Sequence, residues 1–242
     1  MINDQKGLIV ATSTTTDGNM SFRFSENSDV IANRSNFLNR IGLSYSSCVV
    51  MNSEHKDLIS IVDDTTLMGP TTSAESVEAD VLITTLPNIS LLLTTADCIP
   101  LSFYHKASGL IGLAHLSRHT FTNDLIEKIL YELENTFSLS PHTLEFVIGP
   151  HIAVHSYQFS LPLTNVHPKL EPFISYSTNL ASINLTTAVV STLIKQGVKQ
   201  NQVQISETDT YTSATHFSHR SSVSKNDPQG RLATVICNKL EC

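Results

Sequence analysis

Short apolar runs separated by turn residues recur along the chain and predict a series of β-strands. Two of them, Leu101–Tyr104 and Leu110–His115, are joined by a five-residue segment ending in Gly109 and predict a β-hairpin. The other strands are predicted over Gly7–Thr12, Cys48–Asn52, Leu58–Val62, Ala79–Thr85, Ser90–Thr95, Leu144–Ile148, Val203–Ser206 and Leu232–Cys237.

Three segments instead repeat apolar residues at helical spacing. One helix is predicted over Asp29–Ile41, with Ser28 as its N-cap. A second follows Asp124 and Glu127, which have the spacing of a capping box, and a third begins after the N-cap Asn184. Strands and helices do not alternate strictly. We therefore predict an α+β fold with mixed β-sheets flanked by helices in a layered sandwich, as a single domain over residues 1–242.

Composition narrows the class of protein. Hydrophobic residues make up 40% of the sequence, and the formal net charge is −7 without any long basic run, so nucleic-acid binding is not expected. No apolar stretch is long enough to span a membrane, and Gly7–Ala11 is too short for a signal-peptide core. Cys48, Cys98, Cys237 and Cys242 show no paired spacing, so we expect no disulfide framework and a cytoplasmic protein.

The strongest local chemistry is the segment Ala96-Asp97-Cys98-Ile99-Pro100 followed by the hairpin that ends at His115. A turn centred near Ala107 would bring position 98 or 99 opposite position 115. Facing residues of an antiparallel pair are neighbours, so Cys98 and His115 should lie together at the open end of the hairpin. The pair could bind a metal ion, act as a thiol and its base, or be an inert core cysteine beside a hydrogen-bonded histidine.

Several charged side chains bear on this site. Arg118 and His119 lie just before the second helix, a position that favours an anion such as phosphate. Arg220 adjoins a turn-rich loop, and Arg34 lies mid-helix, where it could point inward or into solvent. Asp97 could carry a proton, orient a ligand or stabilise its turn.

The sequence resembles the bacterial laccase-domain family, first described as multicopper polyphenol oxidases and later as zinc-dependent purine nucleoside phosphorylases with adenosine deaminase activity. The resemblance covers most of the chain, and its most specific part is the Ala-Asp-Cys-x-Pro element with a histidine 17 residues after the cysteine. It rests on Asn33-Arg34, Ser53-Glu54-His55, Ala79-Asp80, Ile83-Thr84, Ala96-Asp97-Cys98-Ile99-Pro100, Ala114-His115, Ile148-Gly149-Pro150, Phe217-Ser218-His219-Arg220 and Gly230-Arg231.

This resemblance implies a metal site formed by His55, Cys98 and His115, with zinc favoured over copper. It implies phosphorolysis of adenosine or inosine, with adenosine deamination as a further activity, so that the partners are a purine nucleoside and phosphate. We expect a monomer or weak homodimer. Cys98, His115 and Asp97 would then be the catalytic residues. Substrate and phosphate contacts would come from the cations Arg34, Arg118, His119 and Arg220.

Three segments depart from the family pattern. The usual His-Ala-Gly-Trp-Arg-Gly reads His115-Leu116-Ser117-Arg118-His119-Thr120, a Cys-Thr pair reads Asp209-Thr210, and an early Ser-Thr-Arg reads Ser13-Thr14-Thr15. Three other functions stay open: a Cys-His hydrolase editing peptidoglycan precursor peptides, an inactive zinc-binding relative, and a copper-dependent polyphenol oxidase. The oxidase is the least favoured, because the ten histidines include no HxH pattern.

Overall fold

The computed structural model describes residues 2–5, 7–64 and 77–240, which form three β-sheets and several helices. The first six-stranded sheet has the order β1-β2-β15-β7-β3-β5, and the second has the order β14-β10-β8-β9-β6-β4. The strands of the first are β1 (Ile2–Gln5), β2 (Leu8–Thr12), β15 (Leu232–Asn238), β7 (Ser90–Thr95), β3 (Cys48–Asn52) and β5 (Val77–Glu78). Those of the second are β14 (Val203–Ile205), β10 (Glu145–Ile148), β8 (Ile99–His105), β9 (Leu110–Leu116), β6 (Val81–Thr84) and β4 (Ile59–Ile61).

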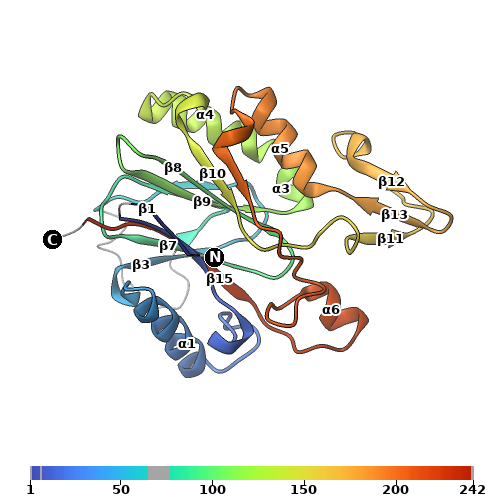
Figure 1. The fold of residues 1–242 in the computed structure, drawn as a ribbon, viewed down its shortest axis with the longest axis horizontal. Helices are drawn as coiled ribbons and strands as arrows, with labels where there is room; N and C mark the ends of the chain where they lie inside the picture. The colour runs from blue at the N-terminus through green and yellow to red at the C-terminus, as the bar shows by residue number, and fades with distance from the viewer. Residues whose placement is uncertain (1, 6, 65–76, 241–242) are drawn as a thin grey trace.

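Both large sheets are mixed. Strand β3 runs parallel to β7 and β5, whereas β7 and β2 run antiparallel to β15. In the second sheet, β8 and β9 form the antiparallel hairpin, and β4 and β14 join by parallel pairing. A third sheet, not predicted from the sequence, consists of β11 (Gln158–Ser160), β13 (Leu180–Ile183) and β12 (Ile174–Tyr176). Figure 1 shows it projecting to one side of the sandwich.

Helices cover the outer faces of the two large sheets (Figure 1). Helix α1 (Asn27–Arg40) packs on the first sheet through Phe37 and Leu38. The second sheet is covered by α4 (Leu125–Phe137) and α5 (Leu185–Lys195), with α3 (Arg118–Thr122) before them. The last helix, α6 (His219–Ser224), lies near the start of β15. The predicted layered α+β sandwich is confirmed.

Successive side chains of β9 alternate between two hydrophobic cores, so this strand joins the helical layer to the layer between the sheets. Leu110, Ala114 and Leu116 belong to the core shared with the helices, whereas Ile111 and Leu113 belong to the core between the sheets. A strand buried on both faces reads as one apolar run, because successive side chains point to opposite sides. This parity puts His115 on the face of β9 that looks toward the first sheet.

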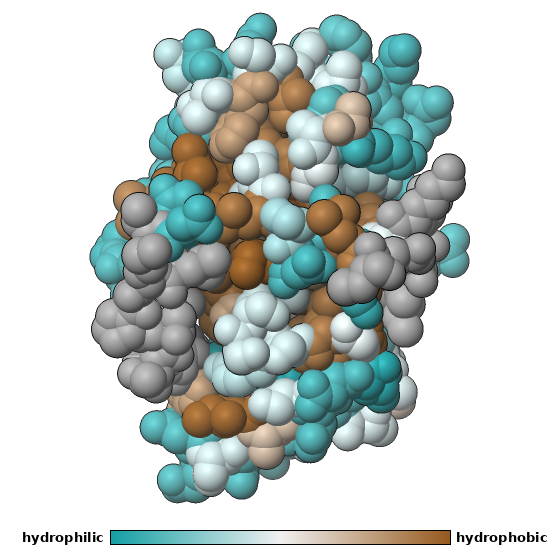
Figure 2. All heavy atoms as spheres, turned by 90° about the vertical axis from the view of Figure 1, so that its left-hand side faces the viewer, coloured by the Kyte–Doolittle hydropathy of each residue, from teal (hydrophilic) through white to brown (hydrophobic). Residues whose placement is uncertain are grey.

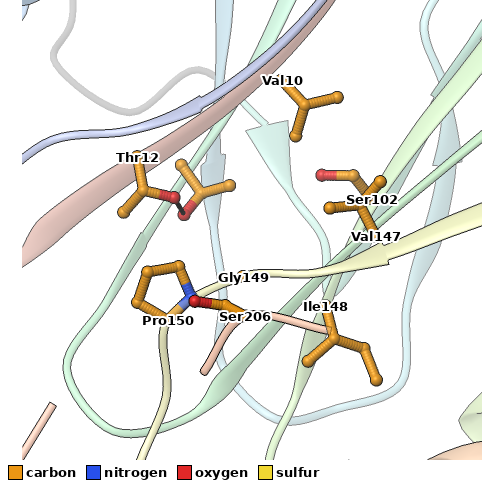
Figure 3. Close-up of a pocket in the computed structure, with 9 residues that line it drawn as sticks. Val10, Thr12, Ser102, Val147, Ile148, Gly149, Pro150 and Ser206 are labelled. Carbon is orange, nitrogen blue, oxygen red and sulfur yellow. Dashed lines mark hydrogen bonds between the residues drawn. The ribbon is translucent and has the colours of Figure 1, made fainter. Parts of the chain in front are cut away.

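The space between the sheets is closely filled. A small cavity of about 10 Å³ lies there (Figure 3), lined by Thr12 and Thr234, whose hydroxyls hydrogen-bond to each other at 2.9 Å. A space of this size holds at most one water molecule. Figure 2 views the sandwich from the side of the C terminus and shows hydrophobic residues toward the middle, with hydrophilic ones at both ends. No helix among the described residues has the length and apolar character needed to cross a membrane.

Two of the three predicted N-caps need correction. Ser28 lies inside α1, which begins at Asn27 after Glu26. Asp124 precedes α4 in a left-handed conformation and makes no side-chain cap, because its carboxylate instead pairs with Lys169. The predicted N-cap Asn184 is confirmed, since its side chain accepts a hydrogen bond from the backbone N–H of Thr187.

Candidate active site

The register of the hairpin differs by one or two positions from the prediction. His115 pairs with Pro100, and Ile99 pairs with Leu116. Cys98 therefore lies two residues before the partner of His115, on the same face of the sheet. Diagonal neighbours of this kind have Cα atoms about 7–8 Å apart, close enough for both side chains to reach one site.

A cavity of about 400 Å³ lies where the two large sheets end, and it brings Cys98, His115 and His55 together. Strands β3 and β7 supply one wall, and the segment before β8 and the end of β9 supply the other. Segments before α1 and around α6 complete it. Its other lining residues are Ser21, Phe22, Arg23, Met51, Asn52, Ser53, Thr94, Thr95, Ala96, His219 and Arg231.

His115 is held by a relay that fixes its tautomer. Ser53 Oγ donates its only proton to the carboxylate of Asp80, so it must accept from Nδ1–H of His115, at 2.5 Å. The Nε2 atom of His115 then carries the free lone pair. Burial, together with the neighbouring His55, lowers the pKa of His115 to about 4, so the ring is neutral at physiological pH.

His55 lies in a tight loop that Asp80 anchors. The Asp80 carboxylate accepts hydrogen bonds from the backbone N–H groups of His55, Lys56 and Asp57, at 3.0, 2.7 and 2.7 Å. These bonds hold His55 in a left-handed conformation with φ of 59°. Its Nδ1 hydrogen-bonds with Ser117 Oγ at 2.9 Å, which leaves Nε2 to face outward.

Cys98 is half-buried, and burial raises the pKa of its thiol to about 12, with a further contribution from Asp97. Asp97 itself has a φ of 85° and does not line the cavity. Its carboxylate accepts from Thr210 Oγ1 at 2.7 Å and from the backbone N–H of Arg220 at 2.6 Å. Of the roles left open for Asp97, these contacts favour stabilising the turn that presents Cys98.

The donor set fits a zinc ion in its chemistry. Two imidazoles and one thiol line one cavity, and the Nδ1 atom of each imidazole is held by a hydrogen bond to a serine hydroxyl. The rings of His55 and His115 lie 4.7 Å apart between centroids. As they stand, however, no three His, Cys, Asp or Glu side chains among the described residues are arranged as a metal-binding group. Binding would require the three side chains to converge.

The cavity is also basic. Arg23, Arg231 and His219 line it, and no Asp or Glu is among its described lining residues. Arg231 was visible in the sequence only as part of the Gly230-Arg231 segment, and His219 only beside Arg220. Arg23 carried no sequence signal, because it lies in a loop that reaches the cavity only through the fold.

The four cations predicted from the sequence lie outside this cavity. Arg34 is fully buried, donates to the carbonyl of Met20 at 2.9 and 2.7 Å, and packs against Phe22. It supports the segment that carries Phe22 and Arg23. Arg220 donates to the carbonyl of Gln158 and lies 4.8 Å from the ring centroid of Phe159.

Arg118 and His119 lie at a cavity other than the candidate active site. Arg118 stacks on the ring of Phe159, 5.1 Å from its centroid, and the centroids of the His119 and His55 rings lie 6.4 Å apart. Both line a second cavity next to the first.

Two glycines in the family segments permit close approaches. A Cβ on Gly149 would lie 2.8 Å from Pro100, and a Cβ on Gly230 would lie 2.8 Å from the ring of Phe217. Such distances exclude any larger residue without rearrangement. The first contact holds the end of β10 against the Cys98 segment, and the second places Arg231 beside α6.

Asp209, which stands where the family has a cysteine, ties together the loop after β10. Burial alone would raise the pKa of Asp209, but hydrogen bonds from Ser156 Oγ, the Ala153 and Tyr211 N–H groups and Thr212 Oγ1 lower it overall. A lowered folded-state pKa means that this stabilisation is present above the ordinary pKa of about 4 and is lost as the pH falls through the folded value.

Asp209→Asn should therefore lower the free energy of unfolding by about 1–3 kcal/mol at pH 7. The substitution replaces one carboxylate oxygen by an NH₂ group, which would then face the hydroxyl and N–H groups that donate to Asp209. Urea unfolding at a series of pH values measures this. The difference from the unchanged protein should shrink as the pH falls below about 4. A difference that is constant with pH would mean that the charge of Asp209 contributes nothing.

Comparison with solved structures identifies the class of fold. The structure of YlmD from Geobacillus stearothermophilus superposes with a TM-score of 0.86 at 22% identity, over 97% of this chain and 93% of that one. A Bacillus licheniformis hypothetical protein, YfiH, gives a TM-score of 0.84 at 22% identity, over 96% and 93%. The chain thus has the α+β fold of YlmD and YfiH.

Sequence comparison identifies the family. The model described as multi-copper polyphenol oxidoreductase laccase matches residues 5–239, and the chain belongs to that family. A purine nucleoside phosphorylase of Mycobacterium tuberculosis H37Rv is 24% identical over 209 residues, covering 86% of this chain and 78% of that protein. Another, from Bacteroides thetaiotaomicron, is 28% identical over 138 residues, covering 54% and 51%. The resemblance read from the sequence is confirmed.

Proposed function

We propose that this protein is a zinc-dependent enzyme that cleaves purine nucleosides with phosphate, acting on adenosine or inosine, and that it also deaminates adenosine. One observation carries the proposal. His55, Cys98 and His115, which come from separate parts of the chain, line one basic cavity. Relatives named purine nucleoside phosphorylase support the substrate class.

In this proposal His55 and His115 bind the metal through Nε2, and Cys98 binds it through its sulfur. Ser53 fixes the tautomer of His115, Ser117 holds the ring of His55, and the neutrality of His115 keeps its lone pair available at physiological pH. Zinc, when bound, supplies a Lewis acid that polarises an oxygen of the substrate or lowers the pKa of water. Burial of His115 and Cys98 keeps bulk water from part of the site.

Arg23 and Arg231 are proposed to hold phosphate, since both face the cavity. Phosphorolysis forms a bond between a phosphate oxygen and C1′ of the ribose while the bond to the purine breaks. Positive charge that is fixed around the attacking phosphate stabilises this transition state. His219, at the start of α6, would supply a further donor on the same wall.

The test is a chromatographic assay of adenosine and inosine, with and without phosphate, before and after chelation. We expect phosphate-dependent release of adenine or hypoxanthine that chelation abolishes and zinc restores, and phosphate-independent formation of inosine from adenosine. A phenol substrate with copper-loaded protein serves as the oxidase arm. Zinc-loaded protein that turns over no nucleoside would overturn the proposal and favour an inactive zinc-binding relative.

A hydrolase that uses Cys98 as nucleophile has less support. Such a thiol needs a lowered pKa or a hydrogen-bonded base. Burial raises the pKa of Cys98 instead. Activity that survives chelation but not alkylation would favour the hydrolase.

A further inference from the structure

The second cavity, of about 440 Å³, lies between α3 and the loop 163–167. Its lining includes Arg118 and His119 from α3 and His167 from the loop. The amides of Asn123 and Asn165 and the hydroxyl of Thr164 add polar groups, and no Asp or Glu is among its described lining residues. The cavity therefore offers several hydrogen-bond donors and no negative charge.

The cations of this cavity are not committed elsewhere. In the described part of the chain, the Arg118 guanidinium makes no hydrogen bond or ion pair and is held by its stacking on Phe159. Stacking orients the planar group and leaves its N–H edge available. The neighbouring carboxylates Asp124 and Glu127 are already paired with Lys169.

His167 faces the same cavity from the opposite side. Its Nδ1 accepts a hydrogen bond from the backbone N–H of Lys169 at 3.3 Å. A ring that accepts at Nδ1 carries its proton at Nε2 when neutral, so it is a donor at the outward atom in either protonation state. Arg118 and His167 can thus donate to one anion from two walls.

The second cavity adjoins the candidate active site through His119. This residue lines the second cavity, and its ring lies edge-on to His55, which lines the first. Ser117 strengthens the link, because its hydroxyl hydrogen-bonds to His55 Nδ1 and also caps α3. The segment that departs from the family pattern therefore forms the boundary between the two cavities.

We propose that the second cavity binds a phosphoryl group, through Arg118, His119 and His167. A guanidinium and two imidazoles that line one cavity supply the positive charge and the N–H donors that bind a tetrahedral oxyanion. The group is either the 5′-phosphate of a nucleotide whose nucleoside part occupies the first cavity, or free inorganic phosphate. The first of these sources rests on the proposed function, whereas anion binding itself does not.

Calorimetric titration of the full chain tests this, with adenosine 5′-monophosphate, inorganic phosphate and uncharged adenosine as probes. We expect Arg118→Gln to weaken the binding of at least one phosphate-bearing probe by roughly 10-fold or more, since a hydrogen bond to a charged group is lost. Adenosine affinity should stay unchanged. Lys195→Gln, which removes an exposed positive charge at the end of α5, should change nothing.

The outcomes separate the sources. Loss confined to the monophosphate assigns the cavity to the phosphate ester, loss confined to inorganic phosphate assigns it to the free ion, and loss of both supports the shared chemistry. His167→Gln, on the other wall, should give the same pattern if Arg118→Gln does not fold. Unchanged binding of both anions in both variants would overturn the proposal. Absence of adenosine binding or turnover would count only against the proposed function.

Discussion

Cys98→Ala is expected to lose most of its bound zinc, from roughly one equivalent per chain, because two imidazoles alone do not complete the ligand set of a zinc site. Nucleoside phosphorolysis should fall by more than about 100-fold, as removal of a ligand exceeds the usual effect of removing its supporting groups. Metal analysis after dialysis and the chromatographic assay measure the two effects. Zinc stoichiometry that is unchanged in this variant would sink the assignment of Cys98 as a ligand.

Cys48→Ala is the matched control for this experiment. Cys48 begins β3, lies outside the cavity, and has a thiol whose pKa burial also raises to about 12. The two variants remove the same atom from similarly buried positions. Zinc content and activity should therefore stay at the unchanged protein's level in Cys48→Ala. A loss shared by both variants would indicate a general effect of thiol removal.

The zinc content and activity of these two variants also distinguish the zinc-dependent phosphorylase from the competing Cys-His hydrolase. A nucleophilic cysteine is needed for turnover but not for metal retention. A Cys98→Ala protein that keeps its zinc would thus exclude Cys98 as a ligand and favour the hydrolase. Joint loss of metal and activity, with the Cys48→Ala protein intact, favours the phosphorylase.

Periodicity predicted much of the framework, because burial on one or both faces leaves a strong pattern in the sequence. The hairpin of β8 and β9, strand β3 and the cap of α5 at Asn184 all follow from local residues. The register of the hairpin was missed, since turn geometry shifts pairing without changing the pattern of apolar residues. The short strands β11, β12 and β13 carried no clear alternation.

The residues of the candidate site also fall into those that the sequence predicted and those that it did not. Cys98, His115 and His55 were found because they lie in distinctive segments, and they line one cavity. The cations were harder to predict, since a charged residue's sequence position does not reveal which way it points. Arg34 turns inward to the Met20 carbonyl, whereas Arg23 reaches the cavity from a loop. Tertiary contacts alone decide between these outcomes.

Asp80 is the residue on which the geometry of both histidines depends. Its buried carboxylate accepts from Ser53, which fixes His115, and from three backbone N–H groups of the loop that carries His55. An asparagine has the same shape but replaces one accepting oxygen by an amide donor. In either orientation of the amide, its NH₂ group would face the Ser53 hydroxyl or the backbone N–H groups of the loop, which are themselves donors.

Asp80→Asn is therefore expected to lower the free energy of unfolding by about 3–5 kcal/mol, because buried donors lose a charged partner. Zinc affinity of the fraction that folds should fall by roughly 10–100-fold, as the relay to His115 is broken. Urea unfolding and competition with a chelator measure the two effects.

Glu78→Gln is the control, since this carboxylate lies two residues away on the surface and, among the described residues, pairs with Lys56. Exposed ion pairs contribute about 0–1 kcal/mol, so this variant should keep both its stability and its zinc. A small effect of Asp80→Asn on both measurements would mean that the loop and His115 hold their places without the carboxylate. A loss of stability with full zinc affinity would separate the two roles, because Asp80 would then support the fold while the tautomer of His115 is set by the metal itself.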